Sequence, residues 1–86
     1  MSITLRLFAA ARAAAGLGRD DFDAAAAPTV GALLDAATAA YGERFTEVLA
    51  SSRVWVNGDE PTAGRSTALA DGDEVAVLPP VSGGIA

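Results

Sequence analysis

The sequence predicts an α+β domain in which a mixed sheet of four to five strands packs on one main helix. Residues 2–8 near the start and residues 74–78 near the end alternate apolar and other side chains, as half-buried strands do. Between them, residues 29–42 place apolar side chains at helical spacing. Two strong strands with a helix between them indicate a single sheet covered on one face.

Length and composition limit both the architecture and the chemistry. The chain has 86 residues, enough for one compact core and too few for a second domain. Six arginines face eleven acidic residues, a net charge of −5, which argues against nucleic acid or an anionic membrane as a partner and favours a basic protein surface. The chain contains no Lys, Cys or His, so it offers no thiol nucleophile, no imidazole base and no usual zinc ligands.

The first quarter of the chain predicts a strand, a helical turn and a second strand. In "SITLRLF", Ile3, Leu5 and Leu7 share one face of a strand. "AAARAAAG" consists of good helix formers and ends in Gly16, a suitable left-handed residue after a helix. "RDDFD" around Phe22 is expected to form a second or edge strand, whose acidic residues would protect an exposed edge.

The main helix is predicted over "TVGALLDAATAAYG". Thr29 can cap the free amides of its first turn, and Gly42 stands where a terminating glycine is expected. The side chains predicted to pack on the sheet are Val30, Leu33, Leu34, Ala37 and Tyr41.

The last third of the chain predicts a hairpin turn and the final strand. In "RVWVNGDE", Val54 and Val56 lie on one face and Trp55 on the other, and "NG" at residues 57 and 58 suits a tight turn. We expect a weak strand at Glu60–Thr62, then a "DGD" turn into the strand that carries Val75 and Val77. The first and last strands are expected in the centre of the sheet.

The alternate face of these strands carries a second set of apolar side chains. Trp55 either covers this face or marks a docking patch, and the pattern supports both interpretations equally. Ala76 and Leu78 share an alternate face of the last strand, so an apolar patch is expected beside the point where the tail begins.

The chain ends in "PPVSGGIA", which separates a folded part, residues 1–78, from an extended tail, residues 79–86. Pro79 and Pro80 stiffen the tail, whereas Gly83 and Gly84 carry no Cβ and suit a narrow channel. Extended, the stretch from Leu78 to Gly84 reaches about 20 Å.

Periodicity alone does not distinguish a ubiquitin-like β-grasp fold from a ferredoxin-like layout. Four motifs do: "LFAAAR" at 7–12, "TVGALLDA" at 29–36, "VNG" at 56–58 and "LADGDEVAVLPPVSGG" at 69–84. In this order they resemble the small subunit of molybdopterin synthase and related bacterial sulfur-carrier proteins. The resemblance implies a β-grasp fold with a mixed sheet on one main helix.

The resemblance also implies a role for the tail. In that family a partner enzyme uses ATP to adenylate the C-terminal glycine, and a sulfur donor then converts it to a thiocarboxylate; here that glycine is Gly84. The chain is therefore expected to be a carrier and not itself an enzyme, holding no metal or cofactor. The residues expected to bind the partner are Gly83, Pro79, Pro80, Val81, Leu78 and Trp55.

The chain departs from the family pattern because Ile85 and Ala86 follow Gly84. A metal-dependent peptidase would remove them, they are foreign to the natural chain, or carrier chemistry has been lost; we favour removal. The expected partners are the large synthase subunit and an adenylating enzyme, in the cytoplasm, with no nucleic acid or membrane involved. The alternatives are a sulfur carrier for cysteine, thiamine or a sulfur-containing secondary metabolite, or a ubiquitin-like tag joined to lysines.

Overall fold

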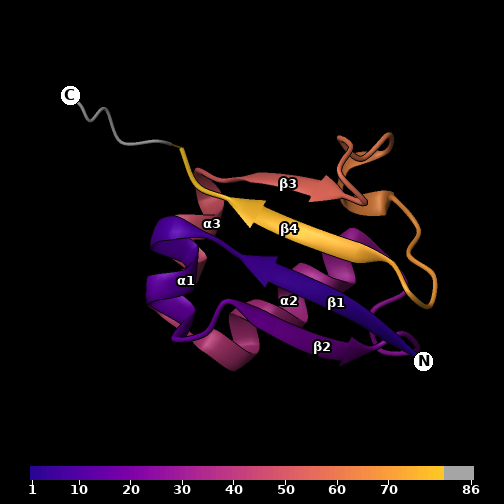
Figure 1. The fold of residues 1–86 in the computed structure, drawn as a ribbon, viewed down its shortest axis with the longest axis horizontal. Coiled ribbons are helices and arrows are strands. Elements are labelled where there is room, and N and C mark those ends of the chain that lie inside the picture. The colour runs from indigo at the N-terminus through magenta and orange to yellow at the C-terminus, as the bar shows by residue number, and fades with distance from the viewer. Residues whose placement is uncertain (81–86) are drawn as a thin grey trace.

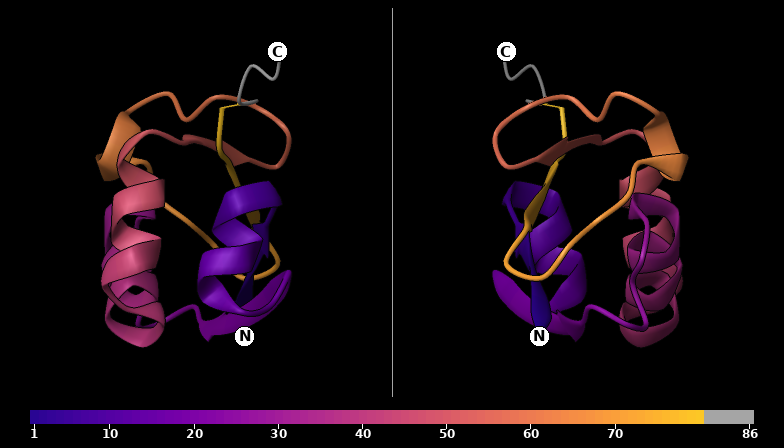
Figure 2. Two further views of the ribbon diagram at one scale, coloured as in Figure 1. Left: turned by 90° about the vertical axis from the view of Figure 1, so that its left-hand side faces the viewer. Right: turned by 90° about the vertical axis from the view of Figure 1, so that its right-hand side faces the viewer.

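The computed structural model describes residues 1–80 as one sheet with helices on one side of it (Figure 1). The elements in chain order are β1 (Ser2–Leu7), α1 (Ala9–Ala15), β2 (Arg19–Asp23), α2 (Val30–Tyr41), α3 (Glu43–Ala50), β3 (Arg53–Val56), the 3₁₀ helix η1 (Gly64–Ser66) and β4 (Glu74–Leu78). Figure 2 shows α2 and α3 standing beside the sheet, while α1 lies at the end of the sheet where β4 finishes.

The sheet has four strands in the order β2-β1-β4-β3. The two central strands, β1 and β4, run parallel, with Leu5 beside Val75 and Leu7 beside Val77. Each edge strand pairs antiparallel with its central neighbour. The predicted mixed sheet, with the first and last strands in its centre, is therefore confirmed.

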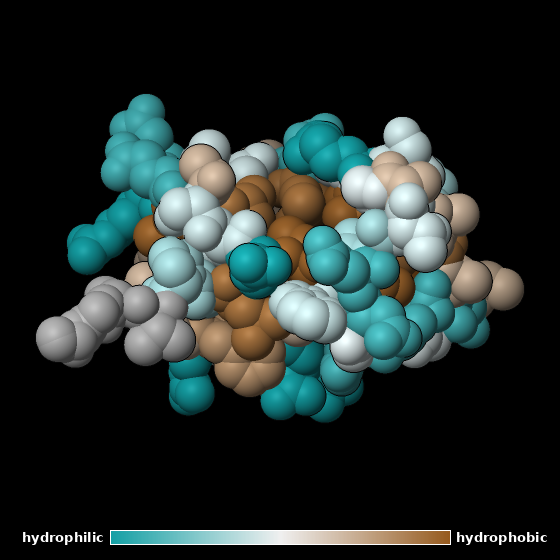
Figure 3. Space-filling view, turned by 90° about the horizontal axis from the view of Figure 1, so that it is seen from above, coloured by the Kyte–Doolittle hydropathy of each residue, from teal (hydrophilic) through white to brown (hydrophobic). Residues whose placement is uncertain are grey.

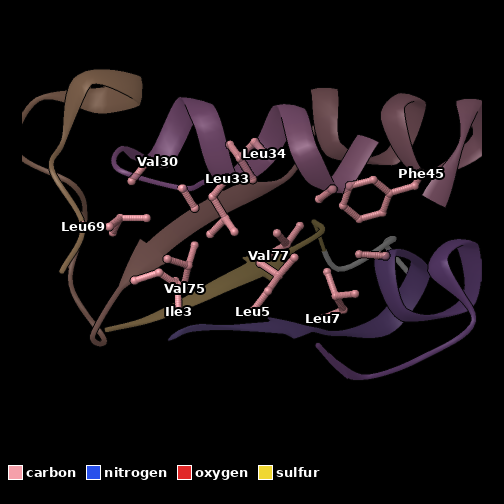
Figure 4. Close-up of a cluster of buried hydrophobic side chains, with 13 residues drawn as sticks. Ile3, Leu5, Leu7, Val30, Leu33, Leu34, Phe45, Leu69, Val75 and Val77 are labelled. Atoms are coloured by element: carbon pink, nitrogen blue, oxygen red, sulfur yellow. The ribbon is translucent and has the colours of Figure 1, made fainter. Parts of the chain in front are cut away.

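The core lies between the sheet and α2 (Figure 4). Alternate residues of β1 and β4 point toward the helices, as the period of two requires. Leu33 of α2 meets these strand residues, and Phe45 of α3 closes one end of the core. The thirteen buried side chains form one cluster: Ile3, Leu5, Leu7, Ala11, Ala27, Val30, Leu33, Leu34, Ala37, Phe45, Leu69, Val75 and Val77.

The ends of α2 confirm the predicted cap and stop. The Thr29 hydroxyl accepts a hydrogen bond from the Ala32 amide at 3.1 Å, which satisfies one free donor of the first turn. Gly42 follows the last helical residue with φ +94°, a conformation that favours glycine. The phase of the helix also agrees with the prediction, because Val30, Leu33 and Leu34 are buried.

The sequence analysis predicted no second full helix, and α3 (Glu43–Ala50) corrects it. Phe45, Val48 and Leu49 follow one another at spacings of three and one, so they share a face of this helix. Phe45 is the largest fully buried side chain among residues 1–80. Its ring contacts Tyr41 edge-on, with the ring centroids 5.0 Å apart.

The weak strand predicted at Glu60–Thr62 does not form. The "NG" turn is present, with φ +51° at Asn57 and +85° at Gly58, and Val56 pairs with Asp59 across it. Counting back from that pair places residue 61 opposite Val54. Pro61 has no N–H to give to the Val54 carbonyl, so the pairing on this edge of β3 stops after one bridge, while the other edge of β3 pairs with β4.

Candidate functional site

The candidate site begins where the C-terminal segment leaves the sheet. β4 ends at Leu78, which pairs with Arg53 of β3, and Phe8 donates a backbone hydrogen bond to the Val77 carbonyl at 3.3 Å. Pro79 follows half-buried and Pro80 exposed. Because proline donates no backbone hydrogen bond, the ladder stops here and the chain departs from the centre of the sheet.

The face of the sheet turned away from the helices carries the predicted apolar residues beside this exit. Trp55 pairs with Ala76 across β3 and β4, and Leu78 lies two residues beyond Ala76 on the same face. All three side chains are half-buried. We call Trp55, Ala76 and Leu78 the open-face patch.

The structure brings part of the predicted site together. Trp55, Leu78 and Pro79 lie within two paired strands and the residue that follows them, and Pro80 continues from there. Pro79, Pro80 and Leu78 line a shallow hollow with Ser51 and Arg53. The predicted Val81, Gly83 and Gly84 lie outside the described residues.

The sequence analysis missed Phe8. Phe8 follows Leu7, the last buried residue of β1, and is 38% exposed. The Arg6 guanidinium lies 5.7 Å from the centre of the Phe8 ring, and the same guanidinium contacts Glu74 at 3.5 Å. The signal was available, because Phe8 is out of phase with the buried residues Ile3, Leu5 and Leu7.

Charge is distributed unevenly over this open face. Arg6 pairs with Arg19 across β1 and β2, and Arg53 begins β3 at the same end of the sheet as the tail exit. Arg6 and Arg53 thus flank the open-face patch, whereas Arg19 lies on the far edge strand β2, and Arg6 and Arg19 are ion-paired with Glu74 and Asp21. Arg53 makes no ion pair within residues 1–80, so it leaves an unpaired positive group beside the tail exit.

One titratable side chain has a clearly shifted pKa, and its surroundings are structural. The Tyr41 hydroxyl donates a hydrogen bond to Asp20 at 2.7 Å, between α2 and β2. Burial, together with the hydrogen bond and the negative charge of Asp20, raises the pKa of Tyr41 far above its ordinary value. The ring packs edge-on against Phe22 and Phe45, so this pair joins the helix layer to an edge strand and stays protonated at neutral pH.

The comparison with family models decides which fold family this geometry belongs to. The model of the ThiS family matches residues 5–84, from β1 through the second tail glycine. The chain belongs to the ThiS family. A search of curated proteins found no match.

Solved structures agree with this membership. SAMP1 of Haloferax volcanii, a small archaeal modifier protein, is 33% identical over 96% of this chain and 99% of its own, with a TM-score of 0.82. A putative molybdopterin converting factor, subunit 1, of Pyrococcus furiosus is 26% identical over 94% and 99%, with a TM-score of 0.80. CysO of Mycobacterium tuberculosis is 26% identical over 92% and 99%, with a TM-score of 0.71.

These similarities confirm the predicted β-grasp fold and place this ThiS family chain among ubiquitin-like sulfur carriers. The comparisons do not assign a pathway, because the similar proteins are named as a modifier protein, a molybdopterin converting factor subunit and CysO. Within residues 1–80 no helix is long and apolar enough to cross a membrane.

Proposed function

We propose that this ThiS family protein carries one sulfur atom as a thiocarboxylate on Gly84, after removal of Ile85 and Ala86. The observation that carries the proposal is the family match, which extends through Gly84 and stops there. The chain has no Cys and no GxxxxGK[ST] phosphate-binding motif, so sulfur and ATP both come from partners.

The chemistry follows from the poor reactivity of a carboxylate. A Gly84 carboxylate oxygen attacks the α-phosphorus of ATP in the adenylating partner, and pyrophosphate leaves. Sulfide-level sulfur from the donor then attacks the acyl carbon and forms the C–S bond of the thiocarboxylate, while the C–O bond to AMP breaks and AMP leaves. This chain contributes the acyl group and the slim segment before it, because Gly83 and Gly84 present no Cβ to the walls of a channel.

The tail exit suits a partner that binds the folded domain and takes up the tail in one step. The open-face patch supplies apolar area at the base of the tail, and aromatic residues such as Trp55 are enriched at interface hot spots. Arg6 and Arg53 beside the patch would attract a partner surface that is acidic around its channel. Pro79 and Pro80, between the patch and the glycines, restrict φ where the tail begins.

Among sulfur-accepting pathways, we propose molybdopterin synthesis, with the large synthase subunit as the partner that receives the sulfur. The support is the likeness to the putative molybdopterin converting factor, subunit 1, of Pyrococcus furiosus, together with the "LFAAAR" and "PPVSGG" motifs. A carrier for cysteine, thiamine or a secondary metabolite uses the same tail chemistry and differs in the acceptor enzyme.

One observation favours a second function, a covalent protein tag. SAMP1 of Haloferax volcanii, which is 33% identical to this chain, is named a small archaeal modifier protein. A tag requires the same adenylate on Gly84, which a lysine amine of a target protein then attacks in place of sulfur. The two functions therefore share their first step and differ in the nucleophile.

The test uses three versions of the protein with one adenylating enzyme from the same organism: the full chain, residues 1–84, and residues 1–84 with Gly84→Ala. In the full chain the Gly84 carbonyl is held in a peptide bond, and the free carboxylate lies about 7 Å farther along. We expect pyrophosphate release and a thiocarboxylate mass from residues 1–84, and neither from the other two versions.

Equal activation of the full chain and residues 1–84 would refute the processing step. Adenylation of residues 1–84 without any thiocarboxylate, but with lysine adducts in the host proteome, would favour the tag. The acceptor is then identified by offering the thiocarboxylate form to the large synthase subunit and measuring sulfur loss by intact mass. The peptidase is tested by incubating the full chain in host extract with and without a metal chelator.

A further inference from the structure

The strand β3 forms one outer edge of the sheet, and the backbone N–H and C=O of one of its residues, Val54, are unpaired within residues 1–80. Asn57 donates its amide to the Glu74 carbonyl of β4 at 2.8 Å, and Val56 exchanges bonds of 2.7 and 3.0 Å with Asp59 on the other side. Backbone groups of successive strand residues point to opposite sides, so the N–H and C=O of Val54 point outward like those of Val56. Neither group has a partner within residues 1–80.

This opening has a definite cause. Pro61 occupies the position that would pair with Val54 if the hairpin continued, and it has no N–H to donate. The loop from residue 60 therefore turns away from the strand. A strand edge with unsatisfied donors and acceptors is a template for another extended chain.

An apolar hollow adjoins this edge on the helix side of the sheet. Two neighbouring depressions of about 280 and 410 Å³ share the side chains of Leu34, Val54 and Arg65. Figure 3 looks onto this edge and shows a brown apolar area surrounded by paler and teal residues. The apolar side chains that line the two depressions are Val30, Leu34, Leu49, Val54 and Pro61, with Ala50 at the margin.

The charges at the rim indicate what kind of chain fits. Arg65 is already held, since its guanidinium contacts Asp35 at 2.7 Å and the Gly31 carbonyl at 3.2 Å. Arg53 makes no ion pair or side-chain hydrogen bond within residues 1–80. Glu60 lines the first depression as well, so a negative group is favoured only on the Arg53 side.

We propose that the β3 edge and this hollow bind an extended segment of a partner protein that carries an aliphatic residue next to an aspartate or glutamate. The partner backbone pairs with the N–H and C=O of Val54, its aliphatic side chain enters the hollow, and its carboxylate meets Arg53. Alternate residues of an extended chain point to opposite faces, which suits this combination because Val54 faces the hollow and Arg53 the open face. The hollow lies on the opposite face of the sheet from the open-face patch, and Arg53 borders both.

The probe is a hexapeptide with acetylated and amidated ends, in which valine and threonine alternate and a glutamate replaces one threonine beside the valine nearest the centre. It is titrated into the full chain labelled with ¹⁵N. We expect the largest amide shifts at Val54, Leu34 and Leu49. A matched peptide that is N-methylated at the central amide cannot donate to the Val54 carbonyl, and it should bind about tenfold more weakly.

Charge reversal supplies the matched variants. Arg53→Glu should weaken binding of the glutamate peptide about three- to tenfold and strengthen binding of the same peptide with lysine in place of glutamate. Arg19→Glu makes the same change on the other edge strand and should alter affinity by less than about twofold. Both residues are exposed, so both variants are expected to fold, which the unchanged spectrum of the core amides would verify.

Three results would overturn the proposal. The first is no shift at Val54 with millimolar peptide. The second is equal binding of the N-methylated peptide, which would exclude strand pairing. The third is a concentration-dependent shift of Val54 without peptide, accompanied by dimers in sedimentation, which would identify a second copy of this chain as the occupant.

Discussion

The two faces of the sheet use the same strands for different purposes. On the face covered by helices, Leu5, Leu7 and Val75 are exposed by no more than 1%. On the open face, Arg6 and Leu78 come from the same strands and are only half-buried. Because successive residues of a strand point to opposite faces, one residue contributes to stability and its neighbour is available to a partner. Substitutions on the two faces should therefore change different measurements.

The largest expected effect is a difference in the free energy of unfolding between the alanine variants of Phe45 and Phe8. Phe45→Ala removes the largest fully buried side chain among residues 1–80 and leaves a cavity at one end of the core, so the free energy of unfolding should fall by about 3–5 kcal/mol. Phe8→Ala removes the same group from a site that is 38% exposed, and it should cost less than about 1.5 kcal/mol. Urea unfolding of both variants measures the difference, and equal losses would show that Phe8 belongs to the core.

The second expected effect is weaker binding of a partner without loss of the fold. Leu78→Asp places a charge in the open-face patch, so the complex with the adenylating enzyme or the large subunit should weaken at least about tenfold. The isolated domain should remain folded because the carboxylate still reaches water at a half-buried position. Calorimetric titration gives the affinity and circular dichroism the fold. Unfolding of the variant would instead assign Leu78 to the core.

The smallest expected effect lies at the margin of the covered face, where Tyr41 bonds Asp20. Tyr41→Phe should lower the free energy of unfolding by about 1 kcal/mol through loss of that hydrogen bond. The folded pKa of Tyr41 is raised, so its contribution is complete below the ordinary tyrosine pKa, about 10, and is lost as pH rises above it. As Tyr41 is the single tyrosine, absorbance titration reports it directly, and an ordinary pKa in the native protein would contradict the buried bond.

The strong elements could be predicted because their patterns are local. β1 and β4 alternate cleanly, and α2 carries its capping threonine and terminal glycine in the sequence itself. The position of the open-face patch followed from the same alternation, since Trp55 is out of phase with Val54 and Val56. Phe8 obeyed that rule too, and it was overlooked because it sits one residue beyond the strand.

The missed helix illustrates the limit of local patterns. α3 is only eight residues long and mixes acidic, polar and apolar side chains, so its own sequence stabilises it little. Burial of Phe45 against α2 and α1 supplies what the short segment lacks.

By itself, the sequence determined the α+β class, the two central strands, the main helix and the chemical character of the tail, because each depends on the periodicity or backbone properties of a few consecutive residues. Tertiary structure alone decided which strands became neighbours, that Pro61 leaves the β3 edge open, and that Arg6 and Arg53 flank the tail exit. These depend on residues far apart in the chain, such as Arg6 and Arg53, which come to lie on one face only when the sheet forms. Pairing between distant segments is selected by the packing of the whole core, which no single segment encodes.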